Sequence, residues 1–112
     1  EQGDSMAQKN LGLMYRRGTG VAQDFKEAAR WYLLAAEQGQ PDAQFLLGAM
    51  YALGVGLPGD VVQAYAWYNL AGANGQAEAT SEKETLGKEM TPDQIDRAQD
   101  FSQALYDKIN GN

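Results

Sequence analysis

Apolar residues recur at helical spacing from the start of the chain. Ala7, Leu11 and Met14 lie three or four residues apart and would share one face of a helix over about residues 4–17. Gly18 follows directly, and glycine is the residue that most often ends a helix. The pattern therefore predicts a helix with one buried face.

A second helix is predicted over about residues 24–38. Asp24 suits the N-cap position, and Glu27 three residues later completes a capping-box pattern. The inner face of this helix would hold Ala28, Trp31, Tyr32 and Ala35, with Gly39 after its end. The first forty residues thus predict one helix pair.

The same pattern returns 36 residues later. Matching positions include the pairs Ala7 and Ala43, Leu11 and Leu47, Gly12 and Gly48, Tyr15 and Tyr51, Gly18 and Gly54, Asp24 and Asp60, Trp31 and Trp67, and Ala35 and Ala71. The copy predicts a third helix from Pro41 to about Leu53 and a fourth from Asp60 to about Asn74. A fixed period of this length is typical of a solenoid, in which each unit buries its apolar face by stacking on the next. We therefore predict an all-α solenoid of about six helices.

The repeat becomes irregular after residue 79. Lys83 and Glu84 stand where the period calls for Leu-Gly, while Thr91, Pro92 and Gln94 form a strong helix start. The helix that follows would bury one apolar face, made of Ile95, Ala98, Phe101, Leu105 and Ile109. A terminal unit with a polar outer face is what closes a solenoid, so we interpret this region as a cap.

These patterns give one domain. We assign residues 1–112 to a single repeat domain, with repeat one over 3–38, repeat two over 39–74, and a degenerate third unit with a C-terminal capping helix over 75–112. Glu1-Gln2-Gly3 matches Glu37-Gln38-Gly39, so the chain is expected to begin in the tail of a preceding helix. Either an upstream repeat was cut away or a processed start falls there. We expect a soluble protein, and the residues present carry no information on a leader peptide or a compartment.

The composition removes several chemistries. The 112 residues include no Cys and no His, which excludes disulfides and thiolate metal sites and removes the commonest general base. The formal net charge of -6 argues against nucleic-acid binding. No apolar run approaches the roughly 20 residues of a membrane span. We therefore predict no catalytic residue, no metal and no cofactor, and we rank an enzyme below a binding protein.

Three features resemble ligand sites but have plainer interpretations. Residues 54–59 match the dinucleotide pattern G-x-G-x-x-G, which requires a preceding strand, whereas helices are predicted on both sides. A turn that needs positive φ explains these glycines better. Trp31 and Trp67 could stack on a sugar or a base, but their repetition beside alanines favours core packing. The glutamates between residues 78 and 89 are interpreted as a solvated helix face rather than a hydrolase pair.

The repeated residues resemble the Sel-one-like repeat family, relatives of the tetratricopeptide repeat that are abundant in bacteria. The family pattern of a small residue, Leu-Gly, Tyr, Gly-x-Gly, Asp, Ala, Trp, Ala and Gly at fixed spacing is met twice over about residues 3–79. The resemblance implies a right-handed superhelix of antiparallel helix pairs, with the first helix of each pair on the concave side. It also implies an adaptor or scaffold role without catalysis. The absence of Cys departs from those members that join their helices with a disulfide.

On such a superhelix the variable positions of the first helices face the concavity. These positions are basic and polar in unit one, apolar in unit two and acidic in unit three. We predict a face that binds a protein or peptide partner, made of Lys9, Asn10, Leu13, Arg16, Arg17, Phe45, Leu46 and Leu53. Its apolar members would anchor the partner, and its cations would pair with the partner's carboxylates.

Two alternatives stay open at this point. The helix over residues 41–53 is apolar nearly all round and must be covered. The third helix pair could cover it through the curvature of the superhelix, or a partner peptide could do so. A second copy of the chain is a further possibility, and the protein would then be a self-associating structural module. Arg16 and Arg17 also have a plain interpretation as cations that complement the helix dipole.

Overall fold

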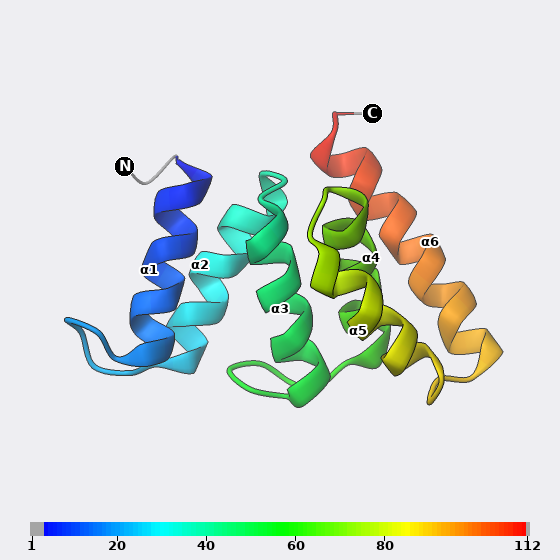
Figure 1. Cartoon of the computed structure of the whole chain (residues 1–112), viewed down its shortest axis with the longest axis horizontal. Coiled ribbons are helices and arrows are strands. Elements are labelled where there is room, and N and C mark those ends of the chain that lie inside the picture. Colours follow the sequence, from blue (N-terminus) through cyan, green and yellow to red (C-terminus); the bar gives the residue numbers. More distant parts are fainter. Residues whose placement is uncertain (1–3, 112) are drawn as a thin grey trace.

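Six helices stacked as a solenoid make up the part of the chain that the structure describes, residues 4–111 of a computed structural model (Figure 1). They are α1 (Ser5–Arg17), α2 (Phe25–Glu37), α3 (Pro41–Leu53), α4 (Val61–Ala73), α5 (Ala77–Gly87) and α6 (Pro92–Ile109). Consecutive helices from α1 to α5 pack on one another. The predicted all-α solenoid is confirmed. The helix tail predicted at Glu1-Gln2-Gly3 lies outside the described residues.

Side chains cap the helices at the predicted positions. The carboxylates of Asp24 and Asp60 each accept a hydrogen bond, 3.1 Å long, from the backbone N–H three residues later. The capping box predicted at α2 also requires the Glu27 side chain to bond the Asp24 backbone. The Glu27 carboxylate instead pairs with Arg30 at 3.2 Å. At α6 the full box is present: the Thr91 hydroxyl and the side chain at position 94 bond each other's backbone.

Glutamine caps the first helix of the second and third units, which the sequence pattern did not predict. Oε1 of Gln40 accepts from the N–H of Ala43 at 2.8 Å, and Oε1 of Gln76 accepts from the N–H of Ala79 at 3.0 Å. These two glutamines are themselves 36 residues apart. The period therefore extends to the polar residues that cap these helices.

A glycine meets a tyrosine ring where the two helices of each repeat cross. A Cβ on Gly12 would lie 2.5 Å from Cε1 of Tyr32, and a Cβ on Gly48 would lie 2.8 Å from Cδ1 of Tyr68. Both distances are far inside the carbon–carbon contact distance of about 3.5–4.0 Å. Because both tyrosines are buried, only glycine allows this approach.

A buried glutamine ties the two repeats together. Gln44 on α3 is fully buried and donates to the carbonyl of Ala36 on α2 at 3.1 Å. Its side-chain oxygen accepts from Asn74, at the end of α4, also at 3.1 Å. One copy earlier, Gln8 accepts from Gln38 at 2.7 Å. These amide pairs satisfy polar groups that would otherwise be costly inside a stacked helical core.

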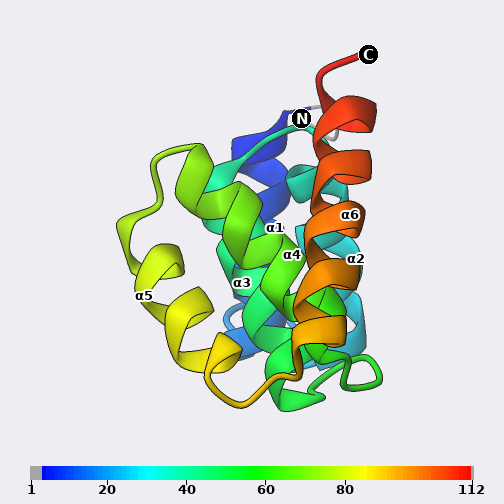
Figure 2. The same ribbon diagram turned by 90° about the vertical axis from the view of Figure 1, so that its right-hand side faces the viewer.

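The third unit departs from a regular helix pair. α5 and α6 both pack on α4, from different sides, and make few contacts with each other (Figure 2). Asn69 on α4 links the two: it accepts from Lys83 on α5 at 3.1 Å and donates to Ser102 on α6 at 2.8 Å. The far end of α6 reaches α2, where Lys108 pairs with Glu37 at 3.4 Å. α6 therefore packs along α4 and contacts the end of α2.

The repeated tryptophans are buried to different degrees. Trp67 is 2% exposed and belongs to the same core cluster as Leu105 of α6. Trp31 remains partly exposed, and the Arg30 guanidinium lies 6.0 Å from its ring centroid. The predicted core role holds fully for Trp67 and only in part for Trp31.

The glycine pattern at residues 54–59 is a turn, as predicted. It follows helix α3 rather than a strand, and Gly54 and Gly56 adopt φ of 68° and 80°. Within residues 4–111 no helix is both long and apolar enough to cross a membrane.

Candidate partner-binding groove

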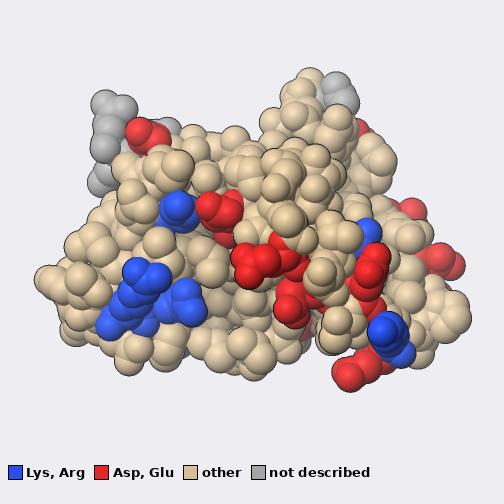
Figure 3. Space-filling model, in the orientation of Figure 1, with Lys and Arg blue, Asp and Glu red and all other residues tan. Residues whose placement is uncertain are grey.

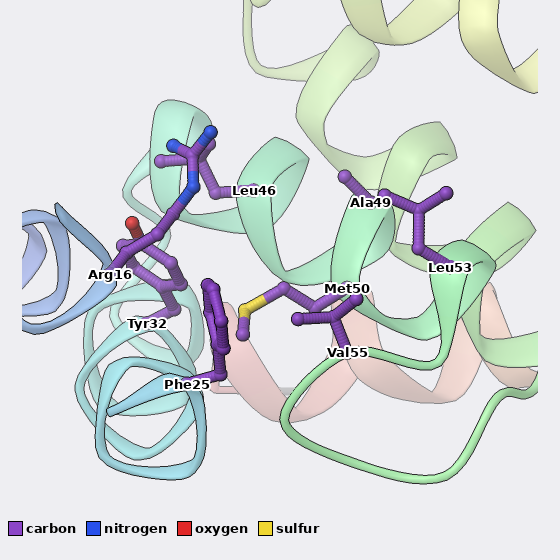
Figure 4. Close-up of a pocket in the computed structure, with 8 residues that line it drawn as sticks. All are labelled: Arg16, Phe25, Tyr32, Leu46, Ala49, Met50, Leu53 and Val55. Carbon is purple, nitrogen blue, oxygen red and sulfur yellow. The ribbon is translucent and has the colours of Figure 1, made fainter. Parts of the chain in front are cut away.

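An apolar pocket opens between the first and second repeats. Its volume is about 230 Å³, and its walls come from α1, α2, α3 and the turn after α3 (Figure 4). The lining residues are Arg16, Phe25, Tyr32, Leu46, Ala49, Met50, Leu53 and Val55. Figure 4 shows Phe25, Met50 and Val55 facing one another at the base, with Arg16 and Leu46 on the opposite side. The pocket is apolar with a single cation at its edge.

Local backbone features set the pocket walls. Phe25 is the first residue of α2, directly after the Asp24 cap, and Arg16 lies in the last turn of α1. The turn after α3 reaches the start of α2, where Gly56 leaves no room for a Cβ against the backbone carbonyl of Phe25. That close approach, at φ of 80°, sets Val55 against the pocket. A side chain at position 56 would open this wall.

Arg16 lies close to a buried tyrosine hydroxyl. Tyr32 is fully buried and its Oη has no hydrogen bond of good geometry among the described residues. Burial raises the pKa of Tyr32, and the nearby guanidinium of Arg16 opposes that rise only in part. Arg16 forms no ion pair within residues 4–111. The pocket edge therefore carries a cation without a carboxylate partner.

A second hollow, of about 280 Å³, lies nearer the start of α3, and Leu46 lines both this hollow and the pocket. The second hollow is lined by Lys9, Leu13, Asp42, Phe45, Leu46, Gln76 and Glu78. Lys9 on α1 pairs with Asp42 on α3 at 3.7 Å, so the charge of Lys9 is already neutralised within the chain. We call the pocket and this hollow together the α3 groove.

Phe45 is covered in part by the chain itself. Its ring lies 5.8 Å from that of Tyr68, and it packs on the cluster that contains Ala79 of α5. Leu53, by contrast, is 76% exposed. α4, together with Ala79 of α5, thus covers the Phe45 side of α3, while Leu53 stays open. Burial, with the carboxylate of Glu82 nearby, raises the pKa of Tyr68 to about 12.

The structure distributes the predicted partner-binding residues over three hollows. Arg16, Leu46 and Leu53 line the pocket, and Lys9, Leu13, Phe45 and Leu46 line the second hollow. Asn10 and Arg17 line a separate hollow of about 180 Å³ with Leu13, Met14 and Thr19. Arg16 and Arg17 are adjacent in sequence but line different hollows.

Sequence reasoning missed several walls of the pocket. Phe25, Tyr32, Met50 and Val55 were not predicted to contact a partner, because they belong to second helices, to the repeated core or to a turn. Phe25 and Val55 have Val61 and Thr19 at the equivalent repeat positions, so the period gives no signal there. Only the packing of two unequal repeats places them together.

Charges are separated along this face. Figure 3 shows Lys and Arg gathered over the C-terminal end of α1, while Asp and Glu gather toward α5. Exposed Arg16 and Arg17 supply the first group, and exposed Glu78, Glu82 and Glu84 contribute to the second. The two charged ends of the predicted gradient, basic over unit one and acidic toward unit three, agree with this distribution.

These features define a helical-repeat protein with an open apolar groove between its repeats. The Sel1 repeat family model matches residues 5–40 and 41–76, and the chain therefore belongs to the Sel1 repeat family. Members of this family are generally protein–protein interaction modules of a non-catalytic scaffold kind.

Two solved structures illustrate the similarity. One is c5321, a protective antigen present in uropathogenic Escherichia coli strains displaying an SLR fold, with a TM-score of 0.92 and 38% identity. The other is a Sel1 repeat protein from Oxalobacter formigenes, with a TM-score of 0.74 and 39% identity. The matches cover 96% and 76% of this chain but only 23% and 35% of those chains. No curated protein matches the chain.

Proposed function

We propose that this chain is a non-catalytic interaction module whose α3 groove binds a short segment of a partner protein. The observation that supports this most strongly is the pocket of about 230 Å³ beside Leu53, which is 76% exposed. Small-molecule sites commonly occupy about 300–1,000 Å³, so the pocket is small for a complete ligand. It is suited to one or two anchoring side chains of a longer segment.

The groove also offers length for such a segment. It runs along α3 from Leu53 toward Asp42, and eleven residues of helix at about 1.5 Å each span roughly 16 Å. An extended segment rises about 3.3 Å per residue, so five or six residues fit the groove. Arg16 at its edge has no ion-pair partner within residues 4–111, which favours a partner segment with a carboxylate near the anchor.

A peptide selection tests this proposal. The immobilised chain is used to select binders from a phage library of random 12-residue peptides, and the affinities of synthetic copies are measured by fluorescence polarisation. Leu53→Glu should weaken binding about 30-fold or more, as expected for a central anchor contact. Leu34→Glu is the matched control, because Leu34 is 39% exposed on α2 and lines none of the hollows described above. Selected peptides that bind both variants equally well would contradict the groove.

A second copy of the chain is the alternative occupant. Leu53, Phe25 and Met6 are all exposed apolar side chains of this half of the molecule. Light scattering behind a size-exclusion column separates the two cases. A dimer that Leu53→Glu converts to a monomer, while Leu34→Glu does not, would replace the partner segment with self-association. A strictly monomeric chain at the concentrations used for selection would remove the alternative.

A further inference from the structure

We infer that the α3 groove selects a partner segment of ordered charge: an apolar anchor residue next to a carboxylate, then a cation about five residues away. This inference rests on the proposed function and deepens it by stating the chemistry of the partner. We derive it from which charged groups of the groove lack an oppositely charged partner among the described residues, and from the distance along α3 between them.

The carboxylate belongs beside the anchor because of Arg16. Its guanidinium is the one cation that lines the pocket, and it has no carboxylate partner within residues 4–111. The other pocket walls are apolar except for Tyr32, whose hydroxyl is buried. A carboxylate that binds here would form a charge-assisted contact at the edge of an apolar site, where the local dielectric is lower than in water.

The cation belongs at the other end because that end carries excess negative charge. Asp42 and Glu78 line the second hollow, and Lys9 neutralises only one of them through its 3.7 Å pair with Asp42. A segment that entered in the opposite order would meet like charges at both ends, and like-charge juxtaposition is costly.

The spacing follows from the helix that forms the floor of the groove. Leu53 and Asp42 are eleven residues apart on α3, or roughly 16 Å, which an extended segment covers in about five residues. The chain as a whole carries a net charge of -6, so long-range attraction does not favour an acidic partner. The preference must come from contact with Arg16 itself.

Arg17 provides an internal control for the proposed contact between Arg16 and the partner's carboxylate. It neighbours Arg16 in sequence but lines a different hollow, with Asn10, Leu13, Met14 and Thr19. Arg16→Glu and Arg17→Glu change the net charge by the same amount. Only the first changes the charge at the pocket, so a difference between them isolates contact from general electrostatics.

The test uses the peptides selected on the unmodified chain. These should be enriched in an apolar residue adjacent to Asp or Glu, with Lys or Arg about five positions away. Arg16→Glu should weaken their binding about tenfold, and replacing the peptide carboxylate with Lys should restore it. Arg17→Glu should change affinity by less than about twofold.

The outcomes separate the two proposals. If binding depends on Leu53 but the peptides show no charge order, or if both arginine variants weaken binding equally, the ordered-charge inference is overturned while the groove stands. If no selected peptide depends on Leu53, the groove itself is lost and both proposals fail. Peptides with the reverse charge order would also overturn the inference.

Discussion

The two tryptophans occupy the same position in successive repeats, yet the fold covers them unequally. Trp67 is 2% exposed, in the cluster that includes Leu105 of α6, whereas Trp31 is partly exposed beside Arg30. The 36-residue period predicts that the two tryptophans contribute equally to stability, whereas their burial in the structure predicts unequal contributions. Replacing each with alanine tests which description is correct.

The expected magnitudes follow from burial. Removing a fully buried Trp costs about 3–5 kcal/mol, because both transfer energy and the resulting cavity count. Trp67→Ala should therefore remove a large part of the roughly 5–15 kcal/mol that stabilises a domain of this size. Trp31→Ala loses less buried area and leaves an open site rather than a cavity, so about 1–3 kcal/mol is expected.

Urea unfolding followed by far-UV circular dichroism measures both free energies without relying on tryptophan emission. Two single-tryptophan proteins, Trp31→Phe and Trp67→Phe, then report the environment of the remaining indole. Trp67 should emit at shorter wavelength and resist acrylamide quenching more than Trp31. Equal destabilisation by the two alanine variants, or a Trp67 that is quenched as readily as Trp31, would refute the asymmetric packing and the covering role of α6.

Three further predictions concern the stacking of α3 on its neighbours. Gly48→Ala should destabilise the protein in urea by about 1–2 kcal/mol, because overpacking against Tyr68 at 2.8 Å outweighs a gain in helix propensity of roughly 1 kcal/mol; a more stable variant would contradict this. Gln44→Leu should cost about 1–3 kcal/mol, since the Ala36 carbonyl keeps only its bond from the Gly39 N–H and the Asn74 amide loses its acceptor; an unchanged urea midpoint would show that no such penalty exists. The pKa of Tyr68 is raised to about 12 in the folded protein, so the unfolded chain loses the phenol proton at lower pH than the folded one. The contribution of this phenol to the free energy of unfolding is therefore full below about pH 10 and declines as the pH rises toward 12. Tyr68→Phe should make the fall in stability above pH 10 less steep; an unchanged slope would show that this phenol is not shielded.

The regular part of the fold could be predicted from the sequence because the repeat reports it twice. Helix α3 begins at Pro41 and ends at Leu53 as predicted, and Asp24 and Asp60 cap their helices as predicted. The same reasoning applied to polar residues would also have found Gln44, which copies Gln8, and the glutamine caps. Periodicity is informative wherever two units must satisfy the same contact.

The third unit and the pocket could not be predicted in this way. The α6 sequence occurs only once, and its apolar face predicts burial but does not identify the helix that it packs against. The structure places α6 across α4 and against the end of α2 rather than beside α5. The pocket likewise depends on Phe25 and Val55, which the period does not repeat. Arg16 and Arg17 were predicted to act together, yet the rotation of roughly 100° between adjacent helix positions directs them to different hollows.

The central claim is that a partner segment lies in the α3 groove, between the repeats. Backbone amide NMR of the ¹⁵N-labelled chain, titrated with a selected peptide, tests it most directly. We predict that the largest shifts cluster at the end of α1, along α3 from Asp42 to Leu53, and at Val55. Shifts concentrated instead on the hollow between α4 and α6, at Asn69, Ser102 and Tyr106, would contradict it.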